Sequence, residues 1–382
     1  METQIEIRPV QNRKDRKRFA KFPWKVYRGE FGTWEAWVPP LLVDEMNQLN
    51  AGKHPFYNHS AVEHFLAWRD GSTVGRVSAI VDHAFNEHNG STTGFFGFFE
   101  SPNDPEIADT LLTTVERWLA ERGMTEMIGP VNLSTNHILG ALINDFDNPP
   151  VVQMGYNPPY YPTLYEQHGL TKYRDLLSYR IDAHTLDLSD KIRRVQEIAR
   201  KRNRIELRRV SIKRDWNWVV PAIREIYNEA WSDNWGFVPW TEEEFNELAR
   251  ELRMLVDEDL VPMAMIDDAP VGFAIAIPDI NVILHTMNGR LLPTGIFRIL
   301  HGRKHIDRIR VAAMGVRHAH HNKGIDAVLM NELWTRGRPK GISKADFSWI
   351  LEENFDLRNL LDAWGTEHYR THRIYGKELT QQ

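Results

Sequence analysis

The sequence contains no cysteine among its 382 residues. Disulfide bonds, thiol catalysis and cysteine-ligated zinc sites are therefore excluded, and a reducing compartment fits this composition. No apolar run reaches the ~18 residues that a membrane-spanning helix needs, and the first residues lack the apolar core of a secretory signal. The net charge of −5 gives no electrostatic basis for binding nucleic acid. We expect a cytoplasmic protein without a nucleic-acid partner.

What the sequence does contain is one unit used twice. Three pairs of segments match in the same order along the chain, each pair about 200 residues apart. The pairs are Ile5–Val10 with Ile205–Val210, Val74–Asp82 with Val271–Asp279, and Leu164–Tyr179 with Leu360–Tyr375. The pattern predicts an N-terminal domain at 1–182, a basic connector helix at 183–203 and a C-terminal domain at 204–382.

A strand, a polar loop and a helix follow one another in the second copy. Arg308–Val316 has the pattern of a strand, and Ile325–Trp334 carries apolar residues at helical spacing. The loop between them is basic and ends at Gly324. A helix N-terminus offers unpaired backbone N–H groups and the positive end of the helix dipole, so this junction predicts a phosphate site.

This loop resembles the Q/R-x-x-G-x-G/A loop of the GCN5-related N-acetyltransferases, the GNAT superfamily. His321 stands where that family has Gln or Arg, and Asp326 where it has Gly or Ala. The resemblance implies an α/β (α+β) fold of two tandem GNAT-like domains, each a mixed central sheet flanked by helices. It also implies that acyl-CoA is a co-substrate and that no cofactor is bound permanently. The residues it assigns to acyl-CoA are Met314, Gly315, Val316, His321, Asn322, Lys323, Gly324, Ile325 and Asn354.

The first copy lacks this loop. Its corresponding helix is preceded by acidic residues, and Asp104 and Glu106 would occupy the helix start and repel a pyrophosphate. We therefore assign acyl-CoA to the second copy only, with the first copy structural or helping to bind the acceptor.

Acyl transfer to an amine needs a group that removes a proton from the amine. The candidates are Glu352 (or its neighbour Glu353), Asp233 and His285, and no metal site is predicted from the histidine-rich loop. The GNAT resemblance places the acceptor near the aromatic segment after the first helix of the second copy, and a long insertion in the first copy adds polar candidates. The predicted acceptor-binding residues are Trp231, Asn234, Trp235, Asn132, Ser134 and Asn136.

A second insertion, residues 279–304, combines apolar and basic residues. It predicts peripheral contact with the inner membrane or, alternatively, a helical lid. Together with the motifs GPVNLSTN, NPPYY and NWGF, it resembles the tandem-GNAT family that includes the bacterial ceramide synthases. That resemblance implies N-acylation of a long-chain sphingoid amine. A FemABX-like aminoacyl transferase and a non-catalytic acyl-CoA-binding protein remain alternatives.

Overall fold

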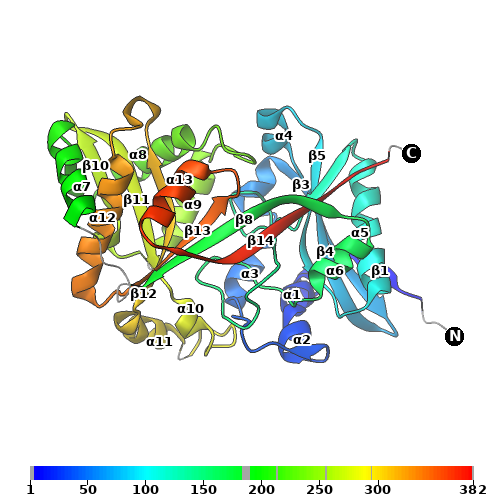
Figure 1. Ribbon diagram of the computed structural model, residues 1–382. Helices are drawn as coiled ribbons and strands as arrows, with labels where there is room; N and C mark the ends of the chain where they lie inside the picture. The colour runs from blue at the N-terminus through cyan, green and yellow to red at the C-terminus, as the bar shows by residue number, and fades with distance from the viewer. Residues whose placement is uncertain (1–3, 183–189, 212–213, 254–255, 294, 381–382) are drawn as a thin grey trace. The chain divides into compact units, whose positions relative to one another are not determined.

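The computed structural model describes residues 4–182, 190–211, 214–253, 256–293 and 295–380 (Figure 1). The chain forms two compact units. Unit 1 comprises Met1–Leu176, Ile283–Phe297 and Arg370–Gln382, and unit 2 comprises Leu177–Val282 and Arg298–Tyr369. The first seven residues of the predicted connector, 183–189, lie outside the described residues.

Unit 1 is built mainly from the first copy. Its elements are β1 (Glu6–Pro9), α1 (Arg13–Lys21), α2 (Pro23–Arg28), β2 (Gly32–Thr33), α3 (Leu42–Gln48), β3 (Ser60–Arg69), β4 (Ser72–Asp82), α4 (His83–Asn89), β5 (Thr93–Glu100), α5 (Pro105–Ala120), β6 (Glu126–Gly129), β7 (Ala141–Leu142), α6 (Tyr161–Gln167) and the start of β8 (Thr171–Asp182). Strands β1, β3, β4 and β5 pair antiparallel in that order, and β5 pairs parallel with β6.

Helix α5 closes one face of the unit 1 sheet. Its buried residues Ile107, Leu111, Val115 and Leu119 recur at helical spacing and pack against the strands in one apolar core. β5 is buried along its whole length, as expected for a central strand.

Unit 2 repeats this order. Its elements are α7 (Asp190–Arg202), β9 (Glu206–Arg209), α8 (Trp216–Ala230), α9 (Glu242–Leu252), β10 (Pro262–Ile266), β11 (Ala269–Pro278), α10 (Asn281–Leu284), α11 (Gly295–Gly302), β12 (Arg308–Val316), α12 (Ile325–Gly337), β13 (Lys344–Leu351), α13 (Phe355–Ala363) and the start of β14 (Glu367–Glu378). Strands β9 to β12 pair antiparallel, and β12 pairs parallel with β13. By the division into units, α10 spans the boundary after Val282 and α11 the boundary after Phe297.

Helices cover both faces of the unit 2 sheet. On one face, Ile325, Val328 and Leu333 of α12 pack on Ile309 and Ala345. On the other, α8 approaches β12 so closely that a Cβ on Gly315 would lie 3.3 Å from that of Ala230. The predicted fold class, a mixed sheet flanked by helices in each half, is confirmed.

The last strand of each copy is shared between the units. β8 begins in unit 1 and ends in unit 2, and β14 begins in unit 2 and ends in unit 1. In unit 1, Tyr375 of β14 pairs with Gly129 of β6, and the buried Arg370 guanidinium binds the Asp145 carboxylate at 2.6 Å. The final strand of the second copy is therefore part of the first unit's sheet.

Candidate active site

The loop after β12 ends in a helix start with unused donors. Asn322 and Gly324 adopt left-handed backbone conformations, with φ of 61° and 71°. Gly324 is the N-cap of α12, and no side chain in the described part of the chain caps this helix start. Among the described residues, no acceptor meets the backbone N–H groups of residues 322–326. These donors and the helix dipole can hold an anionic group such as a pyrophosphate.

Glutamate side chains of α8 hold the first part of this loop. Glu229 accepts a hydrogen bond from the backbone N–H of His318 at 2.8 Å and binds the Arg317 guanidinium at 2.7 Å. Arg317 also pairs with Glu225. Partial desolvation raises the pKa of Glu229, but these hydrogen bonds outweigh it and the pKa lies below its usual value. The first part of the loop is thus fixed to α8, whereas the backbone N–H groups at its α12 end have no acceptor among the described residues.

The loop side chains are arranged around this helix start. His321 Nε2 lies 3.0 Å from the carbonyl oxygen of Val316, so this nitrogen binds the backbone, and Lys323 Nζ lies 3.0 Å from His320 Nδ1. Desolvation and the neighbouring Lys323 lower the pKa of His320. The Asn203 amide, just past the connector helix, donates to the Lys323 carbonyl at 3.0 Å.

The pairing between strands β12 and β13 ends close to an irregularity in the pairing between β11 and β12. The parallel pairing of β12 with β13 ends at Val311 and Phe347, and the β11–β12 register shifts between Val311 and Ala313. Beyond this point β12 continues to Val316 without pairing to β13 in the described part of the chain. The predicted residues Met314, Gly315 and Val316 lie on this part of β12, whose β13 side is unpaired among the described residues, and a ligand could hydrogen-bond to the backbone there.

Trp231 lies against this strand. Its indole Nε1 donates to the Met314 carbonyl at 3.1 Å, and its ring stacks on Tyr227 with centroids 4.8 Å apart. The backbone N–H of Asn234 donates to the Trp231 carbonyl, and Trp235 follows in the same turn. The structure thus places Trp231, the first residue of the predicted segment, beside β12.

The remaining predicted residues occupy varied positions. Asn354 caps α13, because its side-chain oxygen accepts a hydrogen bond from the Leu357 N–H at 3.1 Å. Glu352 directly follows β13, and Asp233 is exposed in the turn after α8. His285 belongs to unit 1, where its Nε2 contacts the Glu35 carbonyl at 2.6 Å. Within unit 2, therefore, the structure contains two of the three candidate proton acceptors.

The polar residues predicted in the first insertion also belong to unit 1 and are bonded within that unit. Asn132 accepts the Phe98 N–H at 2.7 Å, Ser134 Oγ contacts His137 Nδ1 at 2.8 Å, and Asn136 N–H donates to Ser134 Oγ.

In unit 1 the equivalent positions are filled by the chain itself. Asp104 caps α5 by accepting from the N–H groups of Glu106 and Ile107, and Arg69 binds both acidic side chains. The gap beside β5 is closed as well, because Val131 N–H donates to the Phe96 carbonyl. A Cβ on Gly97 would lie 1.9 Å from the Val131 carbonyl oxygen, which leaves no room between these segments.

Sequence reasoning missed a polar cluster on strands of unit 2. Asp346 of β13 is 2% exposed and accepts hydrogen bonds from the hydroxyls of Ser348 and Tyr369. The guanidinium of Arg310 on β12 donates to Ser348 Oγ at 3.2 Å and to its carbonyl at 2.8 Å. Burial lowers the pKa of Arg310 to about 10, although Asp346 opposes this. The available signal was the pair of polar residues two positions apart in an otherwise apolar strand.

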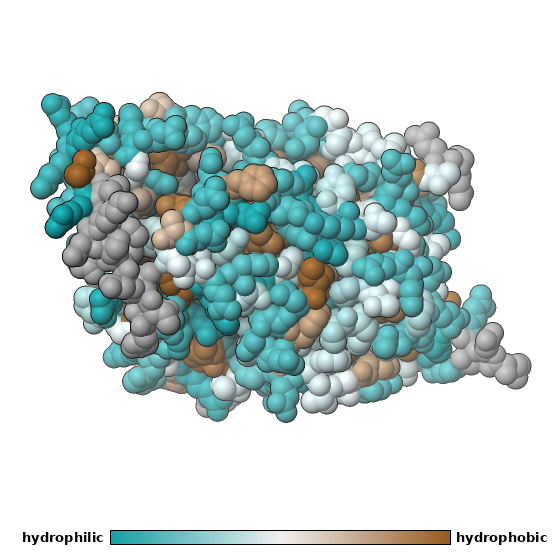
Figure 2. All heavy atoms as spheres, in the orientation of Figure 1, coloured by the Kyte–Doolittle hydropathy of each residue, from teal (hydrophilic) through white to brown (hydrophobic). Residues whose placement is uncertain are grey.

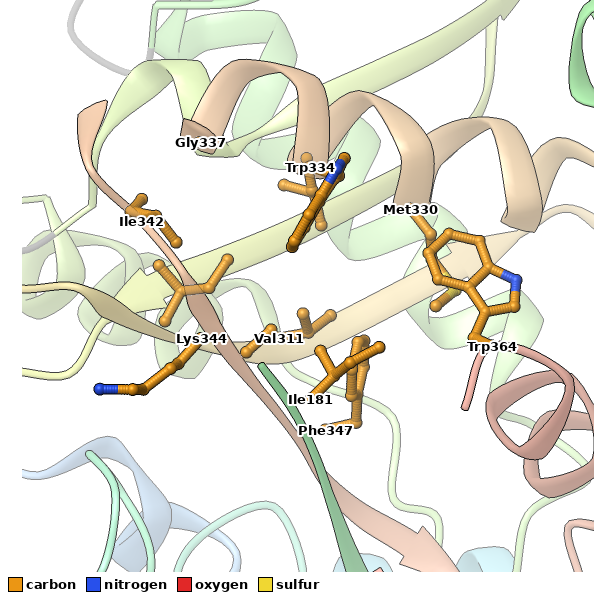
Figure 3. Close-up of a pocket in the computed structure, with 12 residues that line it drawn as sticks. Ile181, Val311, Met330, Trp334, Gly337, Ile342, Lys344, Phe347 and Trp364 are labelled. Atoms are coloured by element: carbon orange, nitrogen blue, oxygen red, sulfur yellow. The ribbon is translucent and has the colours of Figure 1, made fainter. Parts of the chain in front are cut away.

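An apolar pocket lies under α12 within unit 2. It measures about 470 Å³, open solvent at its mouth included. Figure 3 shows Trp334 and Met330 of α12 above Val311 and Phe347, with the Lys344 ammonium pointing away from them. Apart from that lysine, the lining side chains are apolar, so the pocket suits a hydrocarbon group.

Comparison with known proteins identifies the family. The chain is 32% identical over 388 residues to the bacterial ceramide synthase of Caulobacter vibrioides, covering 98% of both chains. The chain belongs to the bacterial ceramide synthase family. It is also 33% identical over 379 residues to protein YghO of Escherichia coli, covering 98% of this chain and 95% of that protein. No protein-family model matches the chain.

The solved structures give the fold independently. A tandem GNAT protein from the clavulanic acid biosynthesis pathway aligns with a TM-score of 0.56 and 12% identity, covering 99% of this chain and 100% of that chain. The predicted fold of two tandem GNAT-like domains is therefore confirmed. Together with the family, it identifies the chain as an N-acyltransferase.

Proposed function

We propose that the protein transfers the acyl group of a long-chain acyl-CoA to the amine of a long-chain sphingoid base, as in bacterial ceramide synthesis. The observation that carries this proposal is the helix start at Gly324, whose backbone donors have no acceptor in the described part of the chain. It supports a diphosphate site in a chain that is 32% identical to a ceramide synthase.

Acyl-CoA binds unit 2 alone in this proposal. Two features of unit 1 support that restriction, namely the Asp104 cap at α5 and the loop that fills the gap beside β5. In unit 2 the pyrophosphate would lie at residues 321–325, the pantetheine arm along Met314–Val316, and Asn354 near that arm. The acceptor would enter past Trp231, whose indole contacts the same strand.

Two apolar features support the proposal that both substrates carry long hydrocarbon chains. The pocket under α12 is apolar, and its lining includes Phe347, where β12 and β13 part. Residues 280–306 contain no Asp or Glu but four Lys and Arg residues, and Phe297 and Leu300 of α11 are 62% and 48% exposed. We therefore propose peripheral contact with the inner face of the cytoplasmic membrane. No helix among the described residues is long and apolar enough to cross a bilayer.

The proposal is tested by following free CoA. The chain has no cysteine, so a thiol reagent reports the CoA product without background from the protein. With palmitoyl-CoA and a long-chain sphingoid amine, we expect amine-dependent CoA release and one N-acylated lipid by mass spectrometry. A short alkyl amine serves as the comparison acceptor, and an aminoacyl ester replaces palmitoyl-CoA as the comparison donor.

Three outcomes separate the possibilities. Release with the sphingoid amine and not with the short amine supports the proposal. Release with another amine alone would retain the acyltransferase and reject the lipid acceptor. Binding of palmitoyl-CoA without release with any amine would contradict catalysis and leave an acyl-CoA-binding protein.

A further inference from the structure

The apolar pocket of unit 2 begins at the segment of β12 along which the pantetheine arm is proposed to lie. Met314 of that segment packs against an apolar cluster that includes Met330 and Phe347, and both of these side chains line the pocket. Met314 also packs on the core that α12 closes, as do Val311 and Ile309, so these three residues of β12 share one face of the sheet. The pocket is therefore the apolar continuation of the strand segment that would hold the thioester.

The pocket continues along α12, away from the helix start at Gly324. Its α12 side is formed by residues spaced along the helix, namely Met330, Leu333, Trp334 and Gly337. On the strand side, the five positions from Met314 to Ile309 span about 16 Å. An acetyl group would end beside Met314, whereas the tail of a long-chain acyl group would extend along the pocket.

The one charged side chain in the lining does not face the pocket. The Lys344 ammonium binds the Asp307 carboxylate at 2.7 Å, and in Figure 3 it points away from the other labelled side chains. A hydrocarbon chain can therefore leave water and enter the pocket without separating a charged group from its partner.

Gly337 and Ile342 lie at the end of the pocket that is farthest along α12. Gly337 is buried and has helical backbone angles, with φ of −74° and ψ of −40°, so its backbone does not require glycine. Glycine also lowers helix stability relative to alanine. A Cβ at this position would make ordinary contacts of 3.4 to 3.6 Å with the Ile342 side chain. The missing side chain leaves space at the end of the pocket.

We propose that this pocket holds the tail of the acyl group of acyl-CoA and that Gly337 and Ile342 set the longest chain that fits. This inference rests on the proposed function, which places acyl-CoA along Met314–Val316. The pocket lies on the α12 face of the sheet, whereas α8 and Trp231, past which the acceptor would enter, approach β12 from the other face. The acyl chain, rather than the hydrocarbon chain of the acceptor, is therefore the occupant.

Two variants at the end of the pocket should change the chain-length profile in opposite directions. Gly337→Leu fills the space beside Ile342, so kcat/KM for palmitoyl-CoA should fall about 10-fold, while octanoyl-CoA keeps its wild-type value. Ile342→Ala removes side-chain volume at the same place, so the preferred chain should become longer than in the wild type. The measurement is CoA release with saturated acyl-CoAs from octanoyl to eicosanoyl and one long-chain sphingoid amine.

Thr335→Leu is the matched control for the added leucine. Thr335 is exposed on α12 two residues before Gly337, so this variant adds the same side chain to the same helix outside the pocket. Its chain-length profile should be that of the wild type. If Gly337→Leu lowers the melting temperature so far that activity is lost at every chain length, Ile342→Ala decides alone. An unchanged profile in Ile342→Ala would then show that the pocket is only part of the core, and the inference would be wrong.

Failure of the proposed function would look different. If the wild type releases CoA with no amine, the acyltransferase proposal fails, and calorimetric titration with the same acyl-CoAs still tests the pocket. Gly337→Leu should then weaken the binding of palmitoyl-CoA and not that of octanoyl-CoA. If the variants change the preferred chain length of the amine instead of that of the acyl-CoA, the acceptor occupies the pocket and only this inference is overturned.

Discussion

At the residue scale, the two copies place opposite charges at the ends of corresponding strands. β5 ends at Glu100, which accepts a hydrogen bond from the Tyr161 hydroxyl at 2.6 Å, whereas β12 is followed by Arg317. Burial raises the pKa of Glu100 to about 7, although Arg76 opposes the shift. Such a carboxyl makes the folded state bind a proton that the unfolded state has already released.

The sign of this effect predicts how Glu100 changes stability with pH. Its stabilising contribution is present below the unfolded value of 4.5 and is lost as pH rises through about 7. The loss amounts to roughly 3 kcal/mol. The pKa of His64 is lowered to about 3 by burial and works in the opposite direction, destabilising the fold as pH falls below 6.5. The wild-type slope is therefore a sum of opposing effects.

The variant Glu100→Gln separates the contribution of the Glu100 carboxyl from that of His64. We expect the free energy of unfolding, measured with urea between pH 5 and pH 8, to fall less with rising pH in this variant than in the wild type. Glu106→Gln, at an exposed carboxylate of α5, is the control and should follow the wild type. Parallel slopes for the wild type and Glu100→Gln would show that Glu100 has an ordinary pKa.

At the element scale, one short helix carries exposed apolar side chains beside basic ones. Phe297 and Leu300 of α11 are among the exposed large hydrophobics, and Arg298 between them is exposed as well. By contrast, the face drawn in Figure 2 is largely hydrophilic, with hydrophobic residues in small separate patches. The combination of apolar and basic residues fits the headgroup region of an anionic bilayer.

Phe297→Ser tests this contact against a matched control. Phe355 at the start of α13 has the same 62% exposure as Phe297, so Phe355→Ser removes an equally exposed ring elsewhere. We expect Phe297→Ser to weaken co-sedimentation with phosphatidylglycerol vesicles several-fold, because it removes buried apolar area from the membrane interface, and Phe355→Ser to leave it unchanged. Equal binding by all three proteins would contradict the membrane contact of α11.

Among the elements, some features could be predicted from the sequence and others could not. The strand, loop and helix at 308–334 were predictable because Ile325, Val328 and Leu333 recur at helical spacing after an apolar run. The cluster around Asp346 was not, because Tyr369 reaches it from another strand and no local pattern shows which strands are neighbours.

At the scale of the whole molecule, the duplication was visible in the sequence but the sharing of strands was not. The matched segments that contain β8 and β14 have nearly the same pattern, so either strand could have paired within its own copy. The choice depends on distant contacts, such as Arg370 with Asp145 and Lys377 with Glu116. Loop chemistry, in contrast, distinguished the copies from the start, because acidic residues precede α5 and basic residues precede α12.

The most direct test of the central claim is the stoichiometry of palmitoyl-CoA binding by isothermal titration calorimetry, with Gly324→Glu and Gly365→Glu as the paired variants. Both glycines belong to unit 2 and have similar φ angles, 71° and 74°, but only Gly324 is the N-cap of α12. We predict one site per chain, lost in Gly324→Glu through charge repulsion at the helix start and retained in Gly365→Glu. Two sites per chain, or undiminished binding by Gly324→Glu, would contradict the account.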